Sequence, residues 1–265
     1  MLFQRVATSL VGVPVVVGLI WAGGGWYAAA GALILAVATL EFQTPVLGWR
    51  HPLALLAAAL SAGLAAGALV GLDWLVWFAT GAVLIPLAWI ALAGGDPREG
   101  AQRWLWALGG VLYIGWLGAH LVLLREGEIY NGRDWVFLTV FATFANDTSA
   151  YFVGRALGRR ALSPRVSPGK TVEGALGGLA AGLAAVLLLN YFLGIRMGAA
   201  LVLPLALLLP LAAQLGDLAE STLKRAVGVK DASGLVPGHG GLMDRLDSIL
   251  LTTVVVYYYA LWVVP

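Results

Sequence analysis

The chain has 265 residues, of which 60% are hydrophobic and only 11% are charged. A soluble domain carries roughly 25% charged residues, so this composition excludes a globule covered by water and indicates a surface that faces lipid. The net charge of +2 does not indicate nucleic-acid binding, and the lack of Cys excludes disulfides, thiolate metal sites and Cys nucleophiles. The length predicts one transmembrane domain over residues 1–265.

In chain order, nine apolar segments approach the roughly 20 residues that a membrane-spanning helix needs. They are Ser9–Trp21, Trp26–Leu40, Leu53–Val70, Trp74–Leu92, Trp104–Leu124, Trp135–Val153, Ala175–Leu193, Met197–Leu218 and Leu246–Val264. The first is also compatible with a signal peptide, but the similar runs that follow favour a first membrane helix. The sequence therefore predicts an all-α polytopic membrane protein with about nine transmembrane helices.

The Lys and Arg residues give this set of spans an orientation. With the N-terminus in the cytoplasm, all but three of the 16 fall in cytoplasmic segments, the exceptions being Arg125, Arg133 and Arg196. Cytoplasmic loops of membrane proteins attract Lys and Arg. This asymmetry predicts a cytoplasmic N-terminus, a C-terminus outside, and a location in the cell (inner or plasma) membrane.

Polar residues gather in three places, and the first is the segment from Asn146 to Phe152 in the sixth span. Asp147 follows Trp135 by 12 residues, which places it about 18 Å into the bilayer at 1.5 Å per residue. A carboxylate at that depth is costly and usually lines a polar cavity or a functional site. The alternative is an Asp that only hydrogen-bonds a neighbouring helix.

The second place is the loop from Arg155 to Glu173, which contains Gly169-Lys170-Thr171. A P-loop would need Gly at position 164, where Pro164 stands, so that motif is excluded. A basic, Gly-containing turn that enters a helix still favours phosphate binding through Lys170 and backbone N–H groups. The alternative is the general positive charge of cytoplasmic loops, which explains Ser167 beside Lys170 less well.

The third place runs from Gln214 to Asp247. If the eighth helix continues past Asp217, then Asp217, Glu220, Ser221 and Lys224 share one helical face, and Asp244 and Asp247 are three residues apart at the start of the ninth helix. Two antiparallel helices would bring Asp217 near Asp244. Carboxylates beside Lys and Arg favour Mg²⁺ together with a polyanion. The alternative is a network of salt bridges at a helical hairpin.

His239 lies in the turn Pro237-Gly238-His239-Gly240-Gly241 between these helices. It is a candidate general base, phosphate ligand or loop-structuring residue. Transfer of phosphoryl and nucleotidyl groups depends mainly on positioning and charge stabilisation, and a phosphate nucleophile is already ionised at pH 7. Phosphate or loop contact is therefore favoured over proton abstraction.

The segment from Ser221 to Asp247, with Lys-Asp at 230–231, Pro-Gly-His-Gly-Gly-Leu at 237–242 and Asp-Arg at 244–245, resembles the signature of phosphatidate cytidylyltransferases, also called CDP-diacylglycerol synthases. The segments Asn146-Asp147-Thr148 and Ser167-Pro168-Gly169-Lys170-Thr171 resemble two further blocks of that family. The family often has Lys at the position of Gly169, Trp at that of Val172 and Gly at that of Ser149. The resemblance divides the chain into variable hydrophobic spans over 1–140 and a catalytic half over 141–265.

The resemblance implies that the phosphate of phosphatidate attacks the α-phosphorus of CTP and that pyrophosphate leaves. It implies Mg²⁺, with K⁺ beside it as an option, an active site on the cytoplasmic side and a homodimer. The catalytic residues that it implies are Asp217, Asp244, Lys224 and His239. The substrate-binding residues are Ser167, Lys170, Ser221, Arg225, Lys230, Asp231, Arg245 and Asp147. The metal ligands are Asp217, Asp244 and Asp247.

Three other functions remain open to test. A CTP-dependent polyprenol kinase, or a cytidylyltransferase for another lipid phosphate, would share the handling of metal and CTP and differ in the acceptor. A membrane transporter would need polar residues along the whole membrane path. The predicted spans instead place their charged residues mainly toward one face, which favours an enzyme.

Overall fold

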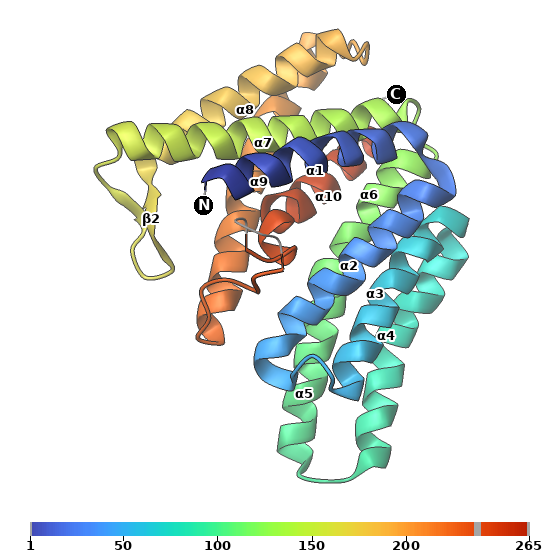
Figure 1. Cartoon of the computed structure of the whole chain (residues 1–265). Coiled ribbons are helices and arrows are strands. Elements are labelled where there is room, and N and C mark those ends of the chain that lie inside the picture. The colour runs from blue at the N-terminus through green and yellow to red at the C-terminus, as the bar shows by residue number, and fades with distance from the viewer. Residues whose placement is uncertain (1, 236–239, 264–265) are drawn as a thin grey trace. The chain divides into compact units, whose positions relative to one another are not determined.

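The structure is a computed structural model that describes residues 2–235 and 240–263 (Figure 1). Most of the described residues belong to ten α-helices: α1 (Leu2–Ala22), α2 (Gly24–Leu47), α3 (Pro52–Val70), α4 (Leu72–Ala93), α5 (Pro97–Gly110), α6 (Leu117–Glu126), α7 (Gly132–Leu157), α8 (Val172–Phe192), α9 (Ala199–Ala226) and α10 (Asp247–Trp262). The other elements are the π-helix η1 (Val111–Trp116), the 3₁₀ turn η2 (Met243–Arg245), and the strands β1 (Ala161–Ser163) and β2 (Ser167–Thr171).

The helices confirm the prediction of an all-α polytopic membrane protein. Within the described residues, seven helical segments are long and apolar enough to cross a membrane, and α5, η1 and α6 together form one of them, Pro97–Glu126. Two shorter apolar helical segments, Leu10–Ala22 and Asp247–Trp262, fall where the first and ninth spans were predicted. Within the described residues, nearly all of each predicted span therefore lies on a helix, whereas the count of nine and the orientation stay predictions.

The chain divides into two compact units. The first comprises Met1–Gly127 and Asp231–Arg245, and the second comprises Glu128–Lys230 and Leu246–Pro265. In the first unit α3 packs between α2 and α4 (Figure 1). A Cβ on Gly67 would lie 3.0 Å from the backbone N of Leu75, so the small residue allows α3 and α4 to approach closely. A single domain over 1–265 stays a prediction.

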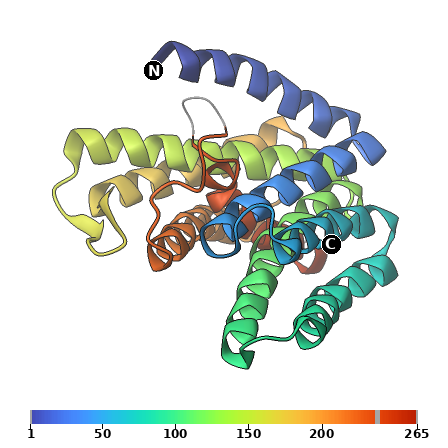
Figure 2. The same ribbon diagram turned by 60° about the horizontal axis from the view of Figure 1, so that its bottom comes forward.

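In the second unit, α7 and α8 run side by side, as both views show (Figures 1 and 2). Their contact uses Gly174, Gly178 and Gly182, which are buried and recur every fourth residue. A Cβ on Gly178 would lie 2.9 Å from the carbonyl oxygen of Asn146, so only Gly allows this approach. Helix α9 packs against α8 and α10, and Thr143 Oγ1 donates to Thr252 Oγ1 at 3.1 Å between α7 and α10.

The segment predicted as a basic turn is instead an antiparallel hairpin. Strands β1 and β2 pair Ala161 with Thr171 and Ser163 with Ser167. Glu173 Oε2 accepts the backbone N–H groups of Arg159 and Arg160 at 3.0 and 3.2 Å, which ties the start of the hairpin to the start of α8. Thr171 caps α8, because its Oγ1 accepts the N–H of Gly174 at 3.1 Å. The hairpin therefore leads directly into a membrane helix.

Candidate functional site

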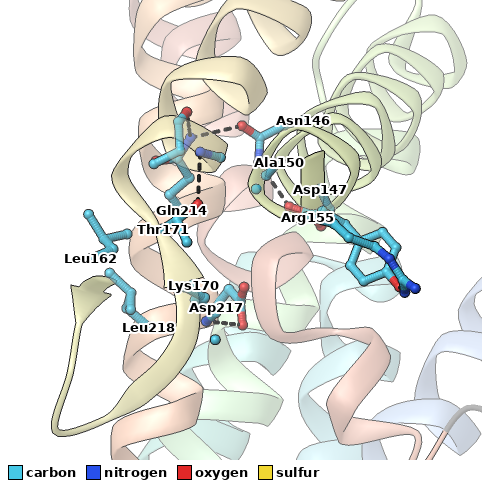
Figure 3. A pocket seen from close by; sticks show the side chains of 15 residues that line it. Asn146, Asp147, Ala150, Arg155, Leu162, Lys170, Thr171, Gln214, Asp217 and Leu218 are labelled. Carbon is cyan, nitrogen blue, oxygen red and sulfur yellow. Dashed lines mark hydrogen bonds and ion pairs between the residues drawn. The ribbon is translucent and has the colours of Figure 1, made fainter. Parts of the chain in front are cut away.

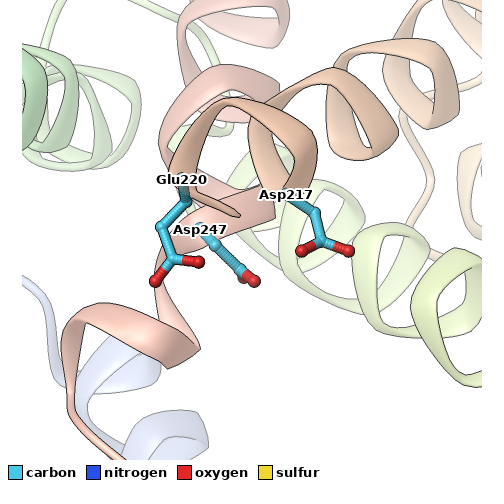
Figure 4. Close-up of side chains that lie close together, drawn as sticks. All are labelled: Asp217, Glu220 and Asp247. Carbon is cyan, nitrogen blue, oxygen red and sulfur yellow. The ribbon is translucent and has the colours of Figure 1, made fainter. Parts of the chain in front are cut away.

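Three carboxylates meet where α9 and α10 lie together in the second unit (Figure 4). Asp217 and Glu220 are one turn apart on α9, and Asp247 is the first residue of α10. Each offers an oxygen that lies within 4.8 Å of the other two. The prediction that the helix continues past Asp217 is confirmed, since α9 runs to Ala226. Like charges this close repel each other, and a divalent cation would neutralise them.

Gly216 makes this meeting sterically possible. A Cβ at this position would lie 2.5 Å from the carbonyl oxygen of Asp247, and Gly216 itself is buried. Real Cβ atoms essentially never come that close to a backbone atom. A side chain at position 216 would therefore push the start of α10 away from α9 and move Asp247 from Asp217 and Glu220.

The β-hairpin places the positively charged side chain of Lys170 beside the carboxylates. Lys170, the fourth residue of β2, places its Nζ 2.5 Å from Asp217 Oδ1 and donates to Ser221 Oγ at 3.3 Å. The hairpin segment and α9 thus meet through Lys170, Asp217 and Ser221, three residues that the sequence assigned to substrate or metal.

A cavity of about 450 Å³ opens beside this contact (Figure 3). Its volume falls in the usual range for small-molecule sites, roughly 300–1,000 Å³. Polar groups from three elements line it, Asp147 from α7, Lys170 from β2 and Asp217 from α9, with apolar Leu162 and Leu218 at its side. The three polar segments that the sequence singled out therefore meet at one cavity in the second unit.

Asp147 is held toward this cavity by a chain of amides. Gln214 Nε2 donates to the carbonyl oxygen of Ala175 at 2.8 Å and to Asn146 Oδ1 at 3.2 Å. Asn146 Nδ2 in turn donates to Asp147 Oδ1 at 2.8 Å, and Asn146 is fully buried. These bonds fix the side chain of Asp147, which supports the prediction that this intramembrane carboxylate lines a polar cavity.

The other basic residues of the second unit that were predicted to contact phosphate have different surroundings. Lys224 Nζ lies 2.6 Å from Oε2 of buried Glu220, one turn earlier on α9. Arg225 donates to the carbonyl oxygens of Val166 and Val229 at 3.2 and 2.9 Å, so it braces the hairpin against the end of α9. Lys230 is exposed. Their predicted phosphate contacts stay predictions.

Ser167 begins β2 and pairs with Ser163. Of the described residues, those lining the cavity start on this strand at Gly169 and do not include Ser167. Its predicted contact with substrate stays a prediction.

The loop over 231–245 belongs to the first unit. Buried Asp244 accepts the N–H of Gly241 at 2.8 Å and the N–H of Ala232 at 3.2 Å, both on its Oδ2. Asp231 and Arg245 are exposed. His239 lies outside the described residues. The predicted proximity of Asp244 to Asp217, which belong to different units, stays a prediction.

The carboxylate cluster fits a divalent cation by its chemistry. Oxygen donors are the ligands that Mg²⁺ prefers, and it is usually bound through one or two carboxylates together with substrate phosphates. The sequence had placed Glu220 on the same face as Asp217 but left it out of the metal ligands. Its spacing of three residues from Asp217 was the signal that could have included it.

We predict that Gly216→Ala displaces Asp247 and lowers activity, with a loss of stability of about 1–3 kcal/mol from overpacking. Gly109→Ala, inside helix α5, is the matched control, since a Cβ there meets nothing within 4 Å. Thermal unfolding in detergent measures the change in stability, and the rate of product formation by the purified protein measures the change in activity. Equal stability and turnover in the two variants would show that the close approach is not needed.

Comparison with known proteins finds several relatives that share one name. The chain is 42% identical over 154 residues to the phosphatidate cytidylyltransferase of Brucella abortus, covering 58% of this chain and 56% of that protein. It is 37% identical over 147 residues to the phosphatidate cytidylyltransferase of Bacillus subtilis, covering 56% of this chain and 54% of that protein. It is also 45% identical over 140 residues to the phosphatidate cytidylyltransferase of Staphylococcus aureus, covering 53% of this chain and 52% of that protein.

Each of these matches spans little more than half of the relative's own length. The family match is more extensive, because residues 3–263 fit the sequence model of the Cytidylyltransferase family. It includes α1 to α6 as well as the segments that form the cavity and the carboxylate cluster. The chain therefore belongs to the Cytidylyltransferase family.

Proposed function

We propose that this protein transfers the cytidylyl group of CTP to phosphatidate, giving CDP-diacylglycerol and pyrophosphate. The observation that carries the proposal is the meeting of Lys170, Asp217, Glu220 and Asp247 beside a cavity, in a chain of the Cytidylyltransferase family. A cation and a cluster of carboxylates are the groups needed to bind a nucleoside triphosphate together with its metal.

In the proposed reaction, a phosphate oxygen of phosphatidate forms a bond to the α-phosphorus of CTP. The bond from that phosphorus to the bridging oxygen of the β-phosphate breaks, and pyrophosphate leaves with the electron pair. The chain supplies position and charge. Lys170 exchanges its contact with Asp217 for a phosphate oxygen, and Ser221 offers a hydroxyl beside it. No general base is required, since the attacking phosphate is ionised at pH 7.

Asp217, Glu220 and Asp247 would hold Mg²⁺, and Asp244 is proposed to join them from the loop. When bound, the cation supplies neutralising charge for the triphosphate. K⁺ is an additional proposed ion at this site. Lys224, ion-paired with Glu220, would keep that carboxylate oriented. Arg225, Lys230, Asp231, Arg245 and His239 are proposed to complete the binding of the two substrates.

The lipid substrate accounts for placing such a site in a membrane protein. The diacyl chains of phosphatidate stay in the bilayer while its phosphate reaches the polar ends of the helices. We propose that the site faces the cytoplasm, where CTP is found, and that the protein resides in the cell membrane. The Lys and Arg distribution supports this orientation. A homodimer is the proposed assembly, to be measured by light scattering in detergent.

The test uses the full chain in detergent with phosphatidate, Mg²⁺ and CTP labelled on the cytosine ring. We expect label in the lipid phase and an equal amount of pyrophosphate in the aqueous phase, both dependent on phosphatidate and on Mg²⁺. Replacing phosphatidate with diacylglycerol, which lacks the attacking phosphate, is the matched control and should give neither product.

Other results would replace the proposal. Release of CDP together with a phosphorylated polyprenol would identify a kinase. Label transfer to another lipid phosphate but not to phosphatidate would keep the reaction and change the acceptor. CTP left intact with every lipid and metal would reject cytidylyl transfer and favour transport.

A further inference from the structure

Glu41 is a buried acid in a helix that otherwise consists largely of apolar residues. It lies on α2 in the first unit, and only 7% of it is exposed. A carboxylate in an apolar membrane helix is costly unless its oxygens are bonded, and such residues usually serve a function. The metal ligands and phosphate contacts proposed above do not use it.

Among the described residues, the hydrogen-bond partners of Glu41 lie in the loop over 231–245 of the same unit, 192 to 202 residues further along the chain. Ser233 Oγ donates to Oε1 at 2.5 Å, and the N–H of Leu242 donates to the same oxygen at 3.1 Å. The N–H of Met243 donates to Oε2 at 2.8 Å. Hydrogen bonds to a charged group are about twice as strong as neutral ones, so this contact fixes the loop to α2.

Glu41 and Asp244 together hold the backbone of residues 241–243. The N–H groups of three successive residues, 241 to 243, are accepted by these two carboxylates, the first by Asp244 and the next two by Glu41. A Cβ on Gly241 would lie 2.8 Å from Glu41 Oε2, so the Gly allows the carboxylate to approach the backbone. Gly240, at φ +83°, adopts a conformation that favours Gly.

We propose that Glu41 is a positioning residue for the cytidylyl transfer: its carboxylate holds the 231–245 loop in the conformation in which Asp244 and Arg245 act. This inference rests on the proposed function, to which it adds a residue from the hydrophobic first half of the chain. Glu41 acts through the loop, because among the described residues its hydrogen bonds come from Ser233, Leu242 and Met243.

The chemistry of the contact makes Gln a discriminating substitution. A carboxylate accepts on both oxygens, whereas the amide of Gln accepts on one side and donates on the other. In either orientation the NH₂ group of Gln would face a backbone N–H, that of Leu242 or that of Met243. Glu41→Gln therefore preserves size and loses one anchor, whereas Glu41→Asp keeps the charge and both acceptors on a shorter side chain.

A matched control exists in the same unit. Glu126 is also a partly buried carboxylate at the end of a membrane segment, and its Oε1 accepts the N–H of distant Gly24 at 2.7 Å. Both acids bind backbone from elsewhere in the chain, but only Glu41 binds the 231–245 loop. Glu126→Gln removes the charge of a comparable acid and leaves one oxygen that can still accept the N–H of Gly24, so it measures what loss of a partly buried charge does away from the loop.

The experiment measures kcat, the KM for CTP and phosphatidate, and hydrogen exchange of the loop amides in the full chain. Glu41→Gln is expected to lower kcat by about 10- to 100-fold, because small misplacements of catalytic groups have effects of that size. We expect KM for phosphatidate to stay within about twofold, faster exchange at residues 241–243, and partial recovery of kcat in Glu41→Asp. Glu126→Gln should retain the wild-type kcat per folded molecule. Its loop amides should exchange as slowly as those of the wild type.

Wild-type kcat and loop protection in Glu41→Gln would overturn the inference, as would a loss equal to that in Glu126→Gln. If Glu41→Gln does not fold, Ser233→Ala removes one partner and should lower kcat and loop protection in the same direction; no change in either would overturn the inference. If the wild type makes no CDP-lipid, the proposed function fails, while loop exchange still reports whether Glu41 holds the loop.

Discussion

Asp217→Asn is expected to abolish the formation of CDP-diacylglycerol, with a loss on the order of a thousandfold at saturating Mg²⁺. Asn has the same size but no charge, so the carboxylate cluster loses affinity for a divalent cation and Lys170 loses its ion-pair partner. Because the Asp217 side chain is 32% exposed, the variant should still fold. Label transfer from CTP across a Mg²⁺ titration measures the effect.

The control is Asp73→Asn, which changes an exposed acid in the first turn of α4. It should retain wild-type turnover and the same Mg²⁺ requirement. Near-normal activity of Asp217→Asn at any Mg²⁺ concentration would mean that Asp217 does not bind the metal, and the cluster would then be a structural salt-bridge network.

Asp244→Asn is expected to be the second inactive variant, with a loss of about a hundredfold or more in kcat. Its carboxylate already accepts two N–H groups of the loop on Oδ2. Asn would have to place its only acceptor oxygen there and would offer a neutral NH₂ group on the other side. The loop geometry is thus partly retained while the charge is lost.

A Mg²⁺ titration separates the two roles of Asp244. If it binds the metal, the concentration of Mg²⁺ needed for half-maximal activity should rise in Asp244→Asn and rise less in Glu41→Gln, which keeps the Asp244 carboxylate and loosens only the loop that carries it. An unchanged Mg²⁺ requirement in both variants would contradict metal binding by Asp244 and assign it to the loop alone. Wild-type turnover in Asp244→Asn would contradict both roles.

The sequence by itself determined the membrane helices, because the length and composition of an apolar segment are local properties. Within the described residues, nearly all of each of the nine predicted segments falls on a helix, with Trp104–Leu124 inside the longer Pro97–Glu126. The few polar residues of this apolar chain also predicted where the cavity would form. Asp147, Lys170 and Asp217 were selected from three separate segments, and they line one cavity.

Local sequence patterns did not predict the β-hairpin formed by β1 and β2. Ser167-Pro168-Gly169-Lys170-Thr171 has the composition of a turn, but it forms a strand because β1 supplies a partner for its backbone. Strand pairing depends on a second segment, which short-range propensity does not specify. The same pairing places Lys170 where it reaches Asp217.

Only the tertiary structure decided which acids lie together. Glu220 joins Asp217 and Asp247 because Gly216 lets the backbone of α10 come against α9. Glu41 lies among apolar residues in the sequence, and its partners become visible only when the 231–245 loop folds against α2. The physical reason is that a carboxylate's neighbours are set by long-range packing, whereas the sequence specifies directly only the neighbours along one helix.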